Sequence, residues 1–114
     1  MSGDDASSPG RETVARRVRD AIRENEVVVF LNDDDGVPNC RFSRRALSLV
    51  ARHREEYATV DVGAAPEAYR SVLADRTGWV TVPQVFVDGE FVGDGDVLAD
   101  LEDRGRLAST LSGT

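Results

Sequence analysis

The spacing of apolar residues changes between the first two patterned segments of the chain. Val14, Val18 and Ile22 recur every four residues, which predicts one amphipathic helix over residues 11–24. The next segment, residues 27–31, is an unbroken apolar run of Val-Val-Val-Phe-Leu. A run of this kind is typical of a central strand that is covered on both faces. The pattern therefore predicts a helix that is followed directly by a buried strand.

The rest of the chain continues this alternation of helices and strands. The further predicted elements are a loop over 32–39, a helix from Phe42 to about His53, a strand over 57–62, a helix over 65–76, a hairpin over 84–92, a helix over 96–104 and a short turn around Leu107 and Leu111. The hairpin rests on Asp88-Gly89, a favourable two-residue turn. Because a helix separates the first two strands, these strands should pair in parallel. The order predicts an α/β, thioredoxin-like fold: a small mixed sheet of about four strands with helices on both faces.

Two of the predicted helices have an inner face that can be read from the sequence. In the helix from Phe42, the expected apolar stripe comprises Phe42, Ala46, Leu47, Val50 and Ala51. In the helix over 65–76, the residues expected to face inward are Tyr69, Val72 and Leu73.

The composition describes one domain of 114 residues with an acidic balance. Acidic residues number 21 and basic residues 14, all of them arginine, for a net charge of −7. This charge argues against non-specific binding to nucleic acid or to an anionic membrane, since both require a basic face. No apolar stretch approaches the ~18–20 residues that span a bilayer. An acidic, lysine-free composition suits a salt-rich cytoplasm, although genomic base composition can also favour arginine over lysine.

The first ten residues differ from the rest of the chain. Residues 1–10 are mostly Gly, Ser, Asp and Pro and contain little to bury, which predicts a disordered acidic tail. They lack the charged and apolar regions of a signal peptide. A cytoplasmic location is therefore expected, and a single cysteine agrees with a reducing compartment. Residues 11–114 are expected to form the folded domain.

Cys40 is the only cysteine, and it stands at the junction between a predicted loop and a predicted helix. Free backbone N–H groups and the helix dipole at such a junction favour the thiolate, which is both a nucleophile and a metal ligand. The position therefore indicates redox chemistry or iron–sulfur binding. Thioredoxin-like redox proteins use Cys-x-x-Cys there, whereas this chain has Cys40-x-x-Ser43. Any disulfide or metal site must recruit a second thiol from outside the chain.

Two further segments are candidates for a binding site. Pro83, in Thr81-Val82-Pro83, comes directly before the first hairpin strand. In thioredoxin-like folds this proline is cis, which turns the backbone of the preceding residue toward a ligand. The second segment, Gly93-Asp94-Gly95-Asp96, precedes the last helix and could bind an anion through free N–H groups and an ammonium through a carboxylate. A plain helix cap with turn glycines explains the second segment equally well.

These motifs, in this order and at this spacing, resemble the monothiol glutaredoxins, whose hallmark is Cys-Gly-Phe-Ser. The similarity runs from about Val14 to Leu111 and is carried by the buried strand, Pro38-Asn39-Cys40-Arg41-Phe42-Ser43, Arg70, Trp79-Val80-Thr81-Val82-Pro83-Gln84, Val87-Asp88-Gly89-Glu90-Phe91-Val92-Gly93 and Asp96. Members of this family have a thioredoxin fold and bind glutathione. As dimers they hold a [2Fe-2S] cluster through two protein cysteines and two glutathione thiols. The resemblance implies that residues 11–114 are a glutaredoxin domain whose missing thiol comes from glutathione.

The resemblance also implies functions for seven positions of this chain. Cys40 would be the reactive thiolate and cluster ligand, and Phe42 would form the wall beside the thiol. Val82, with Thr81 beside it, would pair with the backbone of glutathione's cysteine. Gly95 and Asp96 would hold the γ-glutamyl carboxylate and amine, and Arg70 would contact the glycine carboxylate.

The chain departs from the family pattern inside these motifs. The family's lysine after the first strand is Asn32, and the glycine after the cysteine is Arg41. The proline of the family's Trp-Pro-Thr-x-Pro pattern is Val80, and the second glycine and the cysteine of Gly-Gly-Cys-Asp are Asp94 and Gly95. Arg41 or Arg44 is a candidate to replace part of the missing lysine charge, although both can equally be plain surface arginines. A related small thiol such as γ-glutamylcysteine, which needs fewer carboxylate contacts, is an alternative to glutathione.

Three functions remain open at this point. The first is a monothiol glutaredoxin that carries a [2Fe-2S] cluster as a cluster-bridged homodimer and hands it to apo iron–sulfur acceptor proteins. The second is a weak glutathione-dependent thiol-disulfide oxidoreductase that removes glutathione from proteins through a mixed disulfide at Cys40. The third is a thioredoxin-like interaction module with a silent cysteine. Ser43 favours the first because no resolving thiol is present, and Arg41 favours the second if it lowers the pKa of the thiol.

Overall fold

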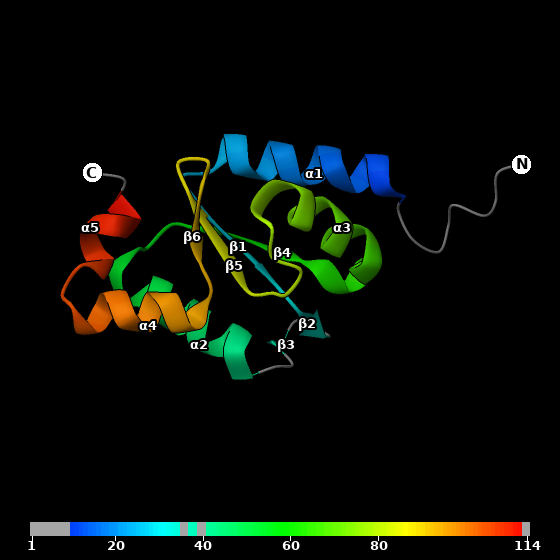
Figure 1. Ribbon diagram of the computed structural model, residues 1–114. Helices are drawn as coiled ribbons and strands as arrows, with labels where there is room; N and C mark the ends of the chain where they lie inside the picture. The colour runs from blue at the N-terminus through cyan, green and yellow to red at the C-terminus, as the bar shows by residue number, and fades with distance from the viewer. Residues whose placement is uncertain (1–9, 35–36, 39–40, 113–114) are drawn as a thin grey trace, which may run out of the picture.

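The computed structural model describes residues 10–34, 37–38 and 41–112, and it contains a four-stranded mixed sheet between two layers of helices (Figure 1). The elements are, in order, α1 (Arg11–Glu24), β1 (Val27–Leu31), β2 (Asp33–Asp34), β3 (Val37–Pro38), α2 (Arg41–His53), β4 (Ala58–Asp61), the 3₁₀ turn η2 (Val62–Ala64), α3 (Pro66–Thr77), β5 (Gln84–Val87), β6 (Glu90–Gly93), α4 (Gly95–Asp103) and α5 (Leu107–Ser112). The strand order of the sheet is β4-β1-β5-β6. The predicted α/β fold with a four-stranded mixed sheet is confirmed.

The pairing of β1 determines which segments meet at each end of the sheet. Strand β1 is parallel to β4, with Leu31 opposite Asp61, and antiparallel to β5, with Phe30 opposite Gln84. The C-terminal ends of β1 and β4 therefore lie beside the N-terminal end of β5. The predicted hairpin joins β5 to β6 through Asp88 and Gly89, which have φ angles of 52° and 84°. The turn lies at the opposite end of the sheet.

The side chains of β1 divide between two cores, and this division explains its unbroken apolar run. Val28 and Phe30 pack into the core under α1 and α3, while Val27, Val29 and Leu31 pack into the core under α2, α4 and α5. Alternate residues of a strand point to opposite faces, so a strand with helices on both faces needs apolar residues at every position. The first core also contains Val14, Val18, Ile22, Tyr69, Val72 and Leu73, as the helical patterns predicted.

Helix α2 presents a different face from the one the sequence predicted. Its buried residues are Ser43, Ala46, Leu49 and Val50, whereas Ala51 is exposed and Leu47 is partly buried. Phe42 is 58% exposed, so its assignment to the inner stripe was wrong. The predicted and observed stripes share Ala46 and Val50, and packing against the sheet selects the serine edge of the helix over the Phe42 edge. The exposure of Phe42 makes its ring available to a ligand.

Some predicted boundaries also change. The predicted loop 32–39 contains two short paired strands, β2 and β3. Helix α4 begins at Gly95, one residue earlier than predicted, because Asp94 is its N-cap. The predicted short turn near the C-terminus is the helix α5, whose Leu107 and Leu111 are buried. The tail predicted over residues 1–10 lies outside the described residues except for Gly10. No described helix has both the length and the hydropathy needed to cross a bilayer.

Candidate functional site

Three segments that are distant in sequence form one pocket of about 320 Å³. They are the first turn of α2, the loop before β5 and the N-terminus of α4. The residues that line the pocket are Phe42, Thr81, Val82, Pro83, Asp94, Gly95 and Asp96. This set includes five of the seven positions to which the resemblance assigned functions, namely Phe42, Thr81, Val82, Gly95 and Asp96. The fold therefore brings the candidate binding segments together around one cavity.

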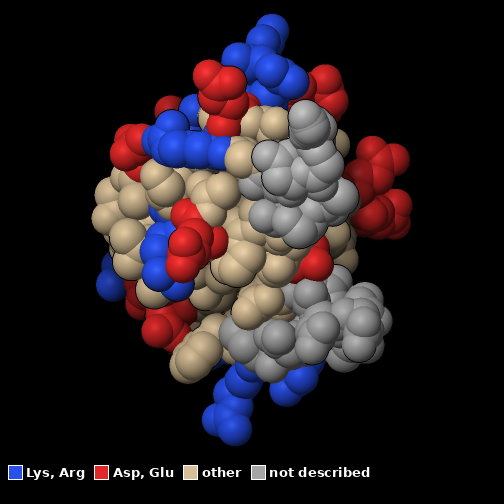
Figure 2. Space-filling model, turned by 90° about the vertical axis from the view of Figure 1, so that its right-hand side faces the viewer, with Lys and Arg blue, Asp and Glu red and all other residues tan. Residues whose placement is uncertain are grey.

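One wall of the pocket is apolar. Pro83 is buried and Val82 is partly buried, and the Val82–Pro83 peptide bond is cis, as predicted. The large exposed apolar residues in the described part of the chain are Phe42, Trp79 and Val80, all from the two segments that form this wall. Figure 2 shows the end of the molecule where β2 and β3 lie, with a central band of uncharged atoms between acidic and arginine side chains. Exposed apolar side chains such as those of Phe42, Trp79 and Val80 suit contact with a ligand or a second protein.

Another wall of the pocket is the N-terminus of α4. The carboxylate of Asp94 accepts a hydrogen bond from the backbone N–H of Val97 at 3.1 Å and so caps the helix. Gly95 and Asp96 occupy the first turn, where backbone N–H groups have no partner within a helix. Such N–H groups favour an anionic group of a ligand.

Two glycines flank the N-cap of α4, and they differ in whether the position has room for a Cβ atom. Gly93 has a φ angle of 148°, and a Cβ atom there would lie 2.6 Å from the side chain of Val97, so this position requires glycine. A Cβ atom on Gly95 would lie 3.4 Å from the carbonyl oxygen of Phe42, which is an ordinary contact. Position 95 therefore has room for a Cβ atom, in agreement with the cysteine that the family pattern has there.

Gln84 holds the loop that supplies Thr81 and Val82, and the sequence analysis assigned it no function. Its side chain is fully buried, and its Nε2 donates to the carbonyl oxygens of Trp79 at 3.0 Å and Thr81 at 2.9 Å. Its Oε1 lies 3.3 Å from the hydroxyl of Thr77. The available signal was a polar residue at the start of the apolar run Gln-Val-Phe-Val, because a buried amide needs partners.

The charged rim of the pocket contains a second residue that the sequence analysis missed. On α2, the Nη1 atom of Arg45 lies 3.3 Å from Oδ1 of Asp96 on α4. Both side chains are largely exposed to solvent. The signal in the sequence was weak, because nothing local relates residues that are 51 positions apart.

Two predicted site residues are not placed in the pocket. Cys40 lies outside the described residues, so its predicted roles stay predictions. Arg70 is exposed on α3 and is not among the residues that line the pocket. Helix α2 begins at Arg41, directly after the cysteine, and the backbone N–H of Asn32 donates to the buried Oγ of Ser43 at 3.4 Å. This hydrogen bond ties the end of β1 to the first turn of α2.

A glutaredoxin family model matches residues 27–92, which is more than half of the chain. The chain belongs to the glutaredoxin family. Glutaredoxin 4 of Escherichia coli strain K12 is 31% identical over 102 residues, covering 90% of this chain and 88% of that protein. The bifunctional monothiol glutaredoxin-S16 of Arabidopsis thaliana, chloroplastic, is 34% identical over 93 residues, covering 80% of this chain but only 32% of the plant protein. With a single cysteine, this glutaredoxin is of the monothiol type.

Solved glutaredoxin structures share the thioredoxin-like fold of this chain. Oxidized glutaredoxin 2 of Chlamydomonas reinhardtii superposes with a TM-score of 0.78 at 25% identity, covering 91% of this chain and 95% of that one. A buckwheat glutaredoxin–glutathione complex superposes with a TM-score of 0.76 at 22% identity, covering 90% and 91% of the two chains. The predicted fold and family are therefore confirmed.

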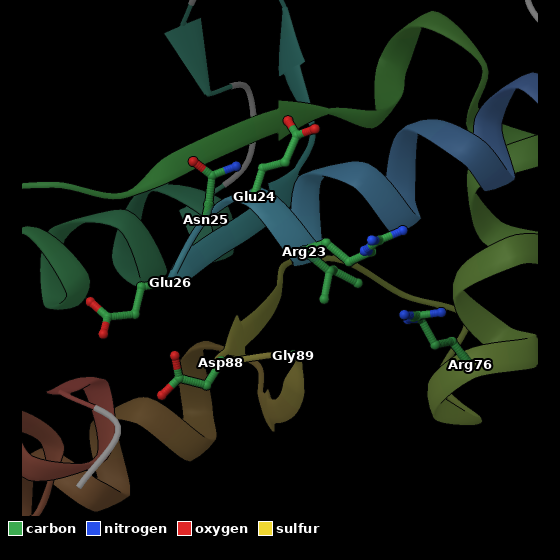
Figure 3. Close-up of a pocket in the computed structure, with 8 residues that line it drawn as sticks. Arg23, Glu24, Asn25, Glu26, Arg76, Asp88 and Gly89 are labelled. Carbon is green, nitrogen blue, oxygen red and sulfur yellow. The ribbon is translucent and has the colours of Figure 1, made fainter.

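This glutaredoxin has a larger pocket, of about 560 Å³, at the opposite end of the sheet (Figure 3). Its lining includes the end of α1 and the hairpin turn at Asp88 and Gly89. Arg23 and Arg76 extend from α1 and α3, but Glu24, Glu26 and Asp88 line the same pocket. Because charges of both signs are mixed there and none of the predicted site residues lines it, we assign the site to the smaller pocket.

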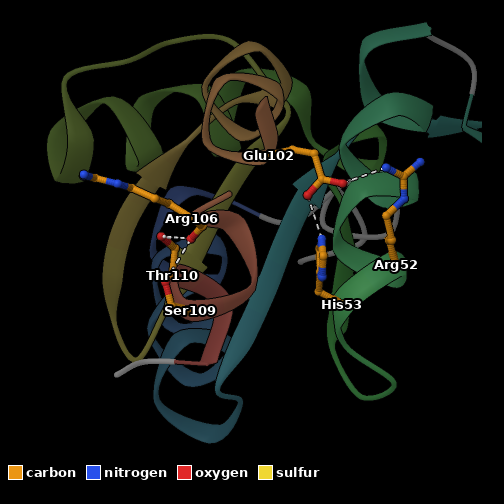
Figure 4. Close-up of polar contacts among 6 residues, drawn as sticks. All are labelled: Arg52, His53, Glu102, Arg106, Ser109 and Thr110. Atoms are coloured by element: carbon orange, nitrogen blue, oxygen red, sulfur yellow. Dashed lines mark hydrogen bonds and ion pairs between the residues drawn. The ribbon is translucent and has the colours of Figure 1, made fainter. Parts of the chain in front are cut away.

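A cluster of polar side chains joins α2 to α4 beyond the pocket (Figure 4). Glu102 of α4 accepts from Arg52 and pairs with Nε2 of His53, each at 2.7 Å. Hydrogen bonds from His53 and then Arg52 hold the pKa of Glu102 below its ordinary value, against a smaller opposing effect of desolvation. The two helices that flank the pocket are thus linked at both ends, by Arg45–Asp96 at the rim and by Glu102 further along.

Proposed function

We propose that this glutaredoxin binds a small γ-glutamyl thiol, glutathione or a close relative, in the pocket between α2, the loop before β5 and α4. The single observation that supports this most strongly is the shared lining by Phe42, Thr81, Val82, Gly95 and Asp96. The apolar wall would lie against the thiol-bearing part of the ligand. Thr81 and Val82 would pair with its backbone, and Gly95 and Asp96 would take its α-amino acid end. Because Arg70 does not line the pocket, it would contact the glycine carboxylate only if the ligand extended beyond the pocket.

We further propose that two copies of the chain carry a [2Fe-2S] cluster as cargo for apo iron–sulfur proteins. The chemistry of the donor set fits this cargo. Each chain has one thiol, Cys40, and among the described residues no group of three or more His, Asp or Glu side chains could bind a metal. Four thiolate ligands therefore require two copies of Cys40 and two bound small thiols. The reduced thiols that this requires suit the cytoplasm.

The residues of this chain would hold and release the cluster rather than change it. Thiol binding in the pocket would orient the ligand's sulfur beside Cys40, and the exposed apolar residues Phe42, Trp79 and Val80 would cover part of the dimer contact. Ser43 is buried and accepts from the backbone N–H of Asn32, so it has a structural role. Its hydroxyl cannot replace the thiol of a resolving cysteine.

The test is anaerobic reconstitution with iron, sulfide and glutathione, followed by visible spectroscopy, size-exclusion chromatography and analysis of bound thiol. The parent protein should form a [2Fe-2S] chromophore on a dimer with two small thiols per cluster. Cys40→Ala should abolish the chromophore and leave the far-UV circular dichroism spectrum unchanged. A matched control, Ser109→Ala on α5, should behave like the parent. A stoichiometric cluster on a monomer, or one on Cys40→Ala, would contradict the proposal.

The alternative reaction is tested on the same preparations. The Cys40 thiolate would attack the glutathione sulfur of a glutathionylated peptide, release the peptide thiolate and form a Cys40–glutathione disulfide. A free glutathione would then reduce this disulfide, which regenerates the Cys40 thiolate and releases glutathione disulfide. Rapid turnover in this assay without cluster assembly would favour the thiol-disulfide oxidoreductase. If the protein neither assembles a cluster nor turns over the glutathionylated peptide, whether or not it binds glutathione, the result would favour an interaction module.

A further inference from the structure

The rim of the pocket contains an ion pair whose acidic partner also lines the cavity. Arg45 of α2 and Asp96 of α4 approach to 3.3 Å, and Asp96 is one of the lining residues of the pocket. Arg45 does not line the cavity itself, so its guanidinium group reaches the rim through this contact. A cation and an anion therefore lie side by side at the α4 end of the pocket.

This pair can exchange its partner for a ligand at little cost. The side chain of Arg45 is 50% exposed and that of Asp96 is 74% exposed. Ion pairs between exposed groups add little to stability, because water already solvates both charges. The N-terminal N–H groups of α4 lie on the same wall and favour a carboxylate. The arrangement offers an acceptor for an ammonium group next to donors for a carboxylate.

The proposed function already assigns the α-amino acid end of the bound thiol to Gly95 and Asp96. We propose that Arg45, which contacts Asp96, is a further specificity-determining residue for this end of the ligand. The ligand's ammonium group would bind the carboxylate of Asp96, while its α-carboxylate would bind the guanidinium group of Arg45 and the N-terminus of α4. The ammonium and carboxylate groups of the ligand are attached to one carbon atom. Their spacing therefore suits Asp96 and Arg45, whose opposite charges are already in contact. This inference rests on the proposed binding of a γ-glutamyl thiol.

The pairing also explains how an exposed carboxylate can select one ligand class. Alone, Asp96 would attract any cation, including inorganic cations of the solvent. With Arg45 beside it, a bare cation gains less, because it must displace or approach a guanidinium group. A zwitterion gains from both partners. The site therefore favours a free α-amino acid end over a simple amine or a simple acid.

The test compares three reduced thiols by calorimetry at low salt, with a phosphine reductant that prevents disulfide formation. Glutathione carries both α-charges, glutaryl-cysteinylglycine lacks the ammonium group, and 4-aminobutanoyl-cysteinylglycine lacks the α-carboxylate. Arg45→Gln should weaken binding of glutathione and of the glutaryl ligand by about five-fold, since the contact is exposed. The same change should leave the aminobutanoyl ligand bound at least as tightly, because Asp96 is then free for the ammonium group.

Arg52→Gln is the matched control. Arg52 lies seven residues, about two helical turns, after Arg45 on α2, and it pairs with Glu102 of the same α4 helix at 2.7 Å. The Arg52→Gln substitution removes the same charge and a similar contact between α2 and α4, but away from the pocket. It should therefore leave the affinity for each of the three ligands unchanged. The inference would be overturned if Arg52→Gln lost as much affinity for glutathione as Arg45→Gln. It would also be overturned if Arg45→Gln lost the same affinity for all three ligands, or lost none. Failure of the parent protein to bind any of the three would instead refute the proposed function on which it rests.

Discussion

Replacing Gln84 by methionine tests whether one buried amide holds the loop that forms the apolar wall of the pocket. Methionine keeps the length of the side chain and removes its donors and its acceptor. The change eliminates the hydrogen bonds to the carbonyl oxygens of Trp79 and Thr81, at 3.0 and 2.9 Å. A net contribution of about 1 kcal/mol for each of these two bonds predicts a loss of ~2 kcal/mol in the free energy of unfolding. The longer contact with the Thr77 hydroxyl, at 3.3 Å, is also lost, but that hydroxyl still donates to the carbonyl oxygen of Leu73 at 3.0 Å. The loss stays near this value because Trp79 and Thr81 are exposed, so water can reach the loop.

The measurement is urea denaturation followed by circular dichroism, together with calorimetric titration of glutathione. The midpoint should fall while the slope of the transition stays the same. Glutathione binding should weaken as well, because the loop supplies Thr81 and Val82. Val18→Ala is the control: it removes buried methyl groups under α1, on the other face of the sheet, and should destabilise the protein without changing ligand affinity. Unchanged stability in Gln84→Met, or equal loss of affinity in both variants, would refute the reasoning.

A second substitution at the same position adds a pH-dependent signature. Gln84→Glu places a carboxyl group in a fully buried position that faces two carbonyl oxygens. Burial and the carbonyl oxygens both disfavour the charged form, so the folded protein should hold the proton to a higher pH than the unfolded chain. Relative to the parent protein at the same pH, the variant should therefore be less destabilised at about pH 4 than at about pH 7, as the raised folded pKa requires. A difference from the parent protein that does not grow as the pH rises across this window would contradict the assigned geometry.

Three other changes give distinct readouts. Arg70→Ala should weaken glutathione binding and barely affect γ-glutamylcysteine, which lacks the glycine carboxylate; equal calorimetric losses would assign Arg70 a structural role. Asn32→Lys should tighten glutathione binding, because it restores a cation at the end of β1, and the gain should shrink at ~1 M salt, where the screening length is about 3 Å; no gain at either salt concentration would mean that residue 32 does not face the ligand. Glu102→Gln should lessen the loss of thermal stability on acidification. A carboxylate with a lowered folded pKa stabilises the fold above its unfolded pKa, and this stabilisation is lost as the pH falls through the folded pKa. If the melting temperature of the variant fell with acidification as steeply as that of the parent, the cluster around Glu102 would contribute nothing.

The sequence alone was sufficient for most of the elements and for the family. The four-residue period of Val14, Val18 and Ile22 and the turn at Asp88-Gly89 act through neighbours a few positions apart, and these interactions are the ones a local pattern records. The order and spacing of the cysteine, proline and glycine motifs led to the glutaredoxin family. The same motifs predicted most of the residues that now line the pocket, because each backbone feature there depends on a particular residue type.

Only the tertiary structure decided which faces and partners these elements have. A helix such as α2 can be turned by one position without losing its apolar character, so the packing that exposes Phe42 and buries Leu49 could not be read from its own sequence. The antiparallel pairing of β1 with β5 joins residues more than 50 positions apart. The same holds for Arg45 with Asp96, which are connected by no local interaction. Gln84 shows the general reason: its polarity was visible in the sequence, but its partners depend on where the chain returns, and the free energy of packing the whole sheet and its helices determines that path.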